Sequence, residues 1–162
     1  MKKIILTLML LVAMATTASA QQVYNELRQK AQEAVSNPAT NGMLRQFNQF
    51  KLDALNYMGI KMREQMPDST VSFLDRQAFA LNNFLSLYMQ TLLDNRQQPA
   101  AYQVKLMKIF IDASVSNPLF NDPDKELVHS YFADGNSLTR FSIDTDWRRA
   151  IIAADHELKK NK

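Results

Sequence analysis

Residues 68–92, DSTVSFLDRQAFALNNFLSLYMQTL, carry the pattern that decides the fold class of this chain. Their apolar side chains recur at alternating steps of four and three residues, which is the period of an α-helix with one apolar face. Asp68 and Ser69 follow Pro67 and are residue types that cap helix N termini, so we expect the helix to begin near them. The apolar positions are Leu74, Ala78, Leu81, Leu85, Tyr88 and Leu92.

Helical periodicity covers most of the remaining chain, and the five prolines stand between the periodic segments. Proline lacks an amide donor and clashes with the preceding turn, so it is tolerated mainly in loops and at helix starts. Asp122 is expected to cap a helix that has Pro123 at its first position, and Asp144 is expected to begin the last helix. The other predicted helices cover residues 22–35, residues 40–65 and a segment that starts at Pro99.

Gly59 lies inside the predicted helix over residues 40–65. Glycine within a helix costs about 1 kcal/mol relative to alanine, so its presence needs a reason. We expect it either to allow the close approach of a neighbouring helix or to mark a kink.

Together these segments predict an all-α fold, a single-domain bundle of five or six helices over residues 21–162. A domain of this size buries enough surface to be stable without disulfides or metal. The chain has no cysteine. That absence also excludes thiol nucleophiles, zinc–thiolate sites and iron–sulfur clusters.

The first twenty residues have the layout of a secretory signal peptide. Lys2 and Lys3 precede an apolar run over residues 4–15, and Ala18-Ser19-Ala20 has the small-x-small form of a cleavage site. We therefore expect residues 1–20 to be a signal peptide that is removed after Ala20. The expected location of the protein is periplasmic or secreted.

Charge and hydropathy limit the partners that the chain is expected to bind. Its formal net charge is +3, and removal of residues 1–20 leaves 17 basic against 16 acidic side chains. A near-neutral chain has no electrostatic reason to bind nucleic acid. No apolar run after Ala20 reaches the roughly 18 residues that cross a bilayer. We expect a protein or envelope partner, and the sequence leaves the oligomeric state open.

Familiar catalytic and cofactor motifs are absent from the sequence. The three glycines are far apart, whereas a phosphate-cradling loop needs several glycines close together. Glu126 and His129 form one E-x-x-H, but di-metal bundles use two such motifs with further glutamates. Glu126 and His129 are therefore weak metal candidates, and no cofactor is expected.

Asp134–Arg149 is the longest polar connection, and it contains the only tryptophan of the chain. Loops beside a rigid scaffold often carry binding sites, and tryptophan and arginine are favoured interface anchors. The segment is therefore a candidate binding surface. The alternative is a plain connector with the tryptophan ring in the core. The candidate residues are Asn136, Arg140, Asp144, Asp146, Trp147 and Arg148.

The signal peptide is followed by Gln21-Gln22 and by a short chain rich in asparagine and glutamine, with 12 of each. In these features the sequence resembles small exported helical proteins of unknown function from Bacteroidetes-type bacteria. The resemblance implies export and a helical domain. It brings no activity and no site residues.

These observations favour a non-enzymatic exported interaction module that acts through a protein or envelope partner. The alternative is a small enzyme or ligand-binding bundle that acts on cell-wall or dietary polymer through the Asp134–Arg149 segment. That alternative requires a pocket lined by at least two of Asp134, Asp144 and Asp146. An exposed Trp147 ring between Arg140 and Arg148 would likewise indicate a binding site there.

Overall fold

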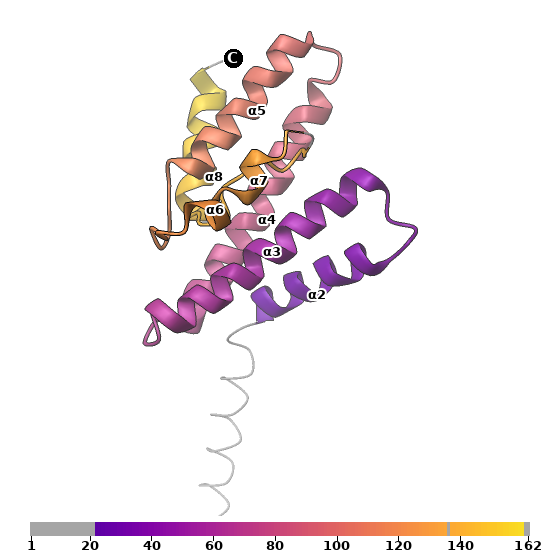
Figure 1. Ribbon diagram of the computed structural model, residues 1–162. Coiled ribbons are helices and arrows are strands. Elements are labelled where there is room, and N and C mark those ends of the chain that lie inside the picture. Colours follow the sequence, from indigo (N-terminus) through magenta and orange to yellow (C-terminus); the bar gives the residue numbers. More distant parts are fainter. Residues whose placement is uncertain (1–21, 136, 161–162) are drawn as a thin grey trace, which may run out of the picture.

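The computed structural model describes residues 22–135 and 137–160. All regular secondary structure within these residues is α-helical (Figure 1). The all-α prediction is therefore confirmed. The described residues form seven helices, against the expected five or six, because the segment after Pro123 makes two helices of four residues each. The predicted signal peptide, residues 1–20, lies outside the described residues.

The long helices form two groups, with a hairpin of two helices packed against three others (Figure 1). The hairpin consists of α2 (Gln22–Ser36) and α3 (Gly42–Gln65). The second group consists of α4 (Val71–Asp94), α5 (Ala100–Val115) and α8 (Trp147–Lys160). The short helices α6 (Lys125–Val128) and α7 (Ser130–Ala133) belong to the connection between α5 and α8.

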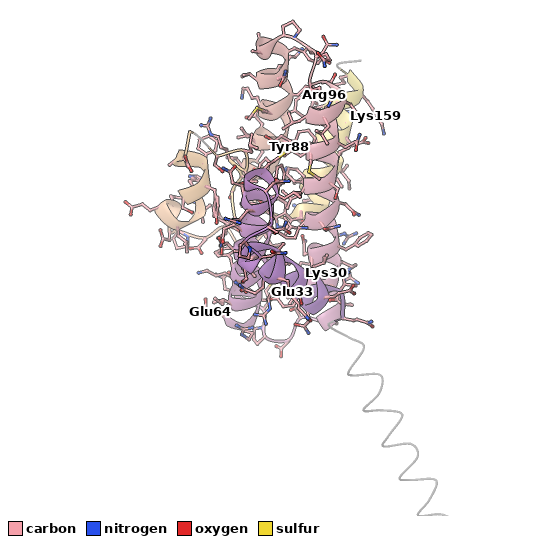
Figure 2. All side chains as sticks on the ribbon, turned by 90° about the vertical axis from the view of Figure 1, so that its right-hand side faces the viewer. Lys30, Glu33, Glu64, Tyr88, Arg96 and Lys159 are labelled. Carbon is pink, nitrogen blue, oxygen red and sulfur yellow. The ribbon has the colours of Figure 1, made fainter. Side chains whose placement is uncertain are left out.

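Helix α4 is the centre of the arrangement, since it contacts α2, α3, α5 and α8. Its predicted apolar face is confirmed, because Leu74, Leu81 and Tyr88 are all buried. Figure 2 shows Tyr88 among the helices, while the labelled charged side chains, such as Arg96 and Lys159, are exposed. The face with the four-and-three spacing is buried against these helices, while the opposite face of α4 stays exposed, and this difference explains the one-sided sequence pattern.

Aromatic rings fill the middle of the core. Phe84 on α4 meets Phe141 and Trp147 edge to face, with ring centroids 5.2 and 5.3 Å apart. Phe50 on α3 contacts the same two rings at 5.4 and 5.9 Å. Edge-to-face pairs add about 1 kcal/mol each beyond the area they bury. The cluster therefore joins α3 and α4 to the connection that leads into α8.

Several predicted helix starts are wrong by one to three residues. Helix α3 begins at Gly42 and not at residue 40, and the N-cap position of α4 is Thr70 and not Asp68 or Ser69.

The starts of α6 and α8 differ where paired aspartates stand. Helix α6 is capped by Asp124, whose carboxylate accepts the Leu127 amide at 3.0 Å, and not by Asp122. Helix α8 begins at Trp147, after the expected start at Asp144. In both places two aspartates stand two residues apart, and residue type alone does not show which one caps the helix.

The close approach of a neighbouring helix explains why residue 59 is a glycine. This was the first of the two roles expected for it, the other being a kink. A Cβ atom at this position would lie 2.4 Å from the hydroxyl of Tyr24 on α2 and 3.2 Å from its Cζ. That hydroxyl donates a buried hydrogen bond to the Leu55 carbonyl at 3.1 Å. Glycine therefore lets α2 and α3 approach closely enough for the bond to form.

Replacing Gly59 by alanine is expected to lower the free energy of unfolding by about 1–2 kcal/mol, although alanine has the higher helix propensity. The added methyl group displaces the buried Tyr24 ring and breaks its bond to Leu55. Urea denaturation measures the change. Gly42→Ala is the matched control, because a Cβ there meets nothing within 4 Å. A Gly59→Ala protein as stable as the Gly42→Ala protein would contradict this explanation.

Candidate functional site

Asp144 is buried and holds the loop that follows α5. One carboxylate oxygen accepts the amides of Leu119 and Phe120 at 3.0 and 2.7 Å, and the other accepts the Asp122 amide at 2.9 Å. The loop turns sharply enough that Asn121 adopts a left-handed backbone conformation, with φ at 52°. Three amides around one carboxylate form an anion-binding nest, and the anion is supplied by the chain itself.

Asp122 is the second buried acid of this region. Its Oδ2 accepts the Tyr57 hydroxyl at 2.9 Å and the Lys61 ammonium at 2.8 Å, both from α3. The hydrogen bond from Lys61 is the main reason that the pKa of the Asp122 carboxyl lies below its usual value. Burial, aided by the Asp144 and Asp122 carboxylates, raises the pKa of the Tyr57 phenol. The pair Asp122–Lys61 therefore ties the loop to α3 as an ion pair.

Asp146 and Trp147 lie at the start of α8. Asp146 Oδ1 accepts the amides of Arg148 and Arg149 at 3.2 and 3.3 Å, as an N-cap residue does. Gln77 on α4 donates to the same oxygen and accepts the Trp147 amide, each at 2.9 Å. The Trp147 ring is 0% exposed, and its Nε1 has no hydrogen-bond partner among the described residues. The structure therefore places this ring in the core.

The remaining candidate residues do not gather on one surface. Arg140 lies over the Phe132 ring at 5.6 Å and lines a groove on α5, whereas Arg148 lines a different groove on α4 and α8. Asn136 lies outside the described residues. Within residues 22–135 and 137–160, Glu126 and His129 belong to no group of three or more His, Asp or Glu that could hold a metal ion.

Asp144→Ala is expected to lower the free energy of unfolding by about 3 kcal/mol, because one buried and two partly buried amides lose their acceptor. Asp112→Ala is the matched control. It removes an exposed carboxylate that pairs with Lys108 on α5, and such a pair contributes about 0.5 kcal/mol or less. Urea denaturation of both variants measures the difference. Equal losses in the two variants would show that Asp144 does not organise the loop.

An open apolar groove at the junction of α2, α4 and α8 is the best candidate site in the described part of the chain. Its volume is about 440 Å³. Helix α4 supplies residues spaced by one helical turn, α8 supplies residues from its first two turns, and α2 supplies one residue from its first turn. The lining residues are Val23, Asp75, Arg76, Phe79, Ala80, Asn83, Arg148, Ile151 and Ile152. We call this surface the α4/α8 groove.

Two large apolar side chains project from the α4/α8 groove into solvent. Phe79 is 58% exposed and Ile152 is 70% exposed, while Ile151, which also lines the groove, is half-buried. Exposed apolar residues are common singly, but two of this size beside one groove form a patch of the kind that marks interaction sites. Most of the surface that lines the groove is apolar.

Two arginines line the same groove as the apolar patch. Among the described residues, the guanidinium of Arg76 donates to the Ser72 hydroxyl alone, at 3.2 Å. Arg148, a predicted site residue, follows the first residue of α8. Among the described residues, no carboxylate lies within ion-pair distance of either guanidinium. Both cations therefore remain available to a ligand at the edge of the patch.

Part of this site had a signal in the sequence. Phe79 and Ile152 lie off the apolar faces that predict the core of their helices, so an apolar residue at these positions has no role in packing those faces. The sequence did not indicate that the two residues line the same groove, because this depends on how α4 and α8 pack.

No family model, curated protein or solved structure matches this chain. Within the part that the structure describes, no helix is both long and apolar enough to span a membrane.

Proposed function

We propose that the protein is a non-enzymatic interaction module that binds a partner polypeptide through the α4/α8 groove. The observation that carries the proposal is the pair of exposed apolar side chains, Phe79 and Ile152, which share a groove with two arginines. Neither arginine has a carboxylate partner among the described residues. Aromatic residues and arginine are enriched in protein interfaces, and the buried centre of an interface is more apolar than the rest of the surface.

A polypeptide fits this surface better than a small molecule does. Small-molecule sites enclose most of their ligand, commonly 70–90% of its surface. Here Phe79 and Ile152 stand out from the surface and do not close over a cavity. A partner that lays apolar side chains beside them removes both from water, which contributes about 25 cal/mol per Å² of apolar area.

The alternative, an enzyme or ligand-binding bundle that uses the acids of Asp134–Arg149, gains no support from the side-chain geometry. Asp144 and Asp146 both accept backbone amides within the fold. Neither of them lines the α4/α8 groove.

The double variant Phe79→Ser/Ile152→Ser is expected to lose partner capture by at least tenfold, because the apolar surface that the partner covers is gone. The measurement is quantitative affinity capture from envelope extract, with an unrelated exported protein as the background. Ile60→Ser/Val104→Ser is the matched control, since these residues are 48% and 62% exposed and lie outside the groove. Equal capture by the two variants, or no capture above background by the unchanged protein, would count against the proposal.

We also propose that the protein is exported and that it loses residues 1–20. The expected product in the periplasm or the medium begins at Gln21, which the intact mass and N-terminal sequencing of the recovered protein determine. Recovery of the full chain, residues 1–162, from the cytoplasm would contradict this part of the proposal.

A further inference from the structure

We propose that the polypeptide bound in the α4/α8 groove is an acidic amphipathic helix, whose apolar face covers Phe79 and Ile152 and whose carboxylates pair with Arg76 and Arg148. The inference rests on the proposed function, and it specifies the chemistry of the partner.

The charge at the edge of the groove is positive because its cations are free while its acid is already engaged. Asp75 is the only acid among the lining residues, and its Oδ1 accepts the Tyr24 amide in the first turn of α2 at 2.9 Å. Its charge therefore faces the positive end of the α2 dipole. Arg76 and Arg148 have no equivalent compensation within the described residues.

The neighbouring charges on α8 do not change this balance. Arg149 pairs with Asp146 at 3.5 Å, and Asp155 pairs with Lys159 in the next turns of the helix. Each of these acids thus has a cation beside it.

The shape of the groove suits a helix. Arg76, Phe79 and Asn83 lie on one face of α4, three and four residues apart, and Arg148 and Ile152 lie four residues apart on α8. Two packed helices present a furrow into which the side-chain ridge of a third helix fits. Amphipathic helices bind such grooves through apolar residues spaced by three and four positions.

Arginine gives this site a preference for carboxylates. The planar guanidinium forms paired hydrogen bonds with a carboxylate, and these bonds strengthen as apolar contacts exclude water. A helix that places glutamates at both edges of its apolar face would engage Arg76 on one side and Arg148 on the other. A partner with lysines in those positions would instead meet like charges.

Two other occupants fit this surface less well. A second copy of the chain, related by a twofold axis through the groove, would bring arginines against arginines. An anionic lipid satisfies the arginines, but the open groove does not enclose an acyl chain. These two occupants are therefore separate outcomes of the experiment.

The experiment uses the full chain and three synthetic helical peptides with the same leucine and phenylalanine face. The flanking positions carry glutamate, glutamine or lysine, and fluorescence anisotropy measures each dissociation constant. We expect the glutamate peptide to bind about tenfold more tightly than the glutamine peptide and the lysine peptide to bind most weakly. Raising the salt concentration should reduce this difference, because it screens the charges at the edge of the interface.

Arg76→Gln/Arg148→Gln is expected to remove the preference for glutamate while some binding through the apolar face remains. Arg96→Gln/Lys105→Gln is the matched control, since it removes the same charge from exposed positions outside the groove and should keep the preference. Phe79→Ser/Ile152→Ser should raise the dissociation constants of all three peptides by a similar factor. Urea denaturation of each variant confirms that it is folded.

The outcomes separate this inference from the proposed function. If the glutamate and glutamine peptides bind equally and both depend on Phe79 and Ile152, the acidic partner is wrong and the apolar docking site stands. If no peptide binds, or if binding does not depend on Phe79 and Ile152, the helical occupant is wrong. Self-association in sedimentation equilibrium, or binding to phosphatidylglycerol vesicles, that is lost in the Arg76→Gln/Arg148→Gln protein would overturn the inference in favour of a second copy or a lipid surface.

Discussion

The fold depends on burying two rings in a helical core: Phe141, which an irregular segment carries, and Trp147, the first residue of α8 after that segment. Phe141 reaches Phe50, Phe84 and Tyr88 at centroid distances of 5.4, 5.2 and 5.0 Å. Such a segment carries backbone polar groups into the interior, and each one left without a partner would cost about 1–3 kcal/mol. The core can therefore form only if the segment and its surroundings supply those partners.

The polar residues around these rings supply the partners. The Ser142 amide donates to the Ser114 hydroxyl oxygen at 3.2 Å, and the Thr145 hydroxyl donates to the Ser142 carbonyl at 2.7 Å. Asp144 binds the amides of the preceding loop, and the Asp146 amide donates to the Asn117 carbonyl at 2.7 Å. The hydroxyls and acids of the Asp134–Arg149 segment suggested a functional surface, but those of Ser142, Asp144 and Thr145 form hydrogen bonds within the fold. The surface that remains open for a partner lies on the outer faces of α4 and α8.

The sequence predicted the parts of the fold that depend on local spacing. Five of the six apolar positions predicted for α4 are buried and Leu92 is half-buried, and Gly59 has the first of its two expected roles, the close approach of a neighbouring helix. It failed where two residues of the same type compete for one role, as with Asp122 and Asp124 at the start of α6. Arg148 was predicted as a site residue and lines the α4/α8 groove, but its neighbours Phe79 and Ile152 were not predicted. They lie 73 positions apart in the numbering, and no periodic pattern links such distant residues.

By itself, the sequence determined that the described chain is helical and where most helices begin and end, because helix periodicity, proline and capping residues act within a few positions. Only the tertiary structure decided the roles of the buried acids and the place of the α4/α8 groove. Whether Asp144 faces solvent or three amides, and whether Phe79 and Ile152 line one groove, depends on how distant helices pack. Those contacts are set by side-chain volume and by the need to satisfy buried polar groups across the whole domain.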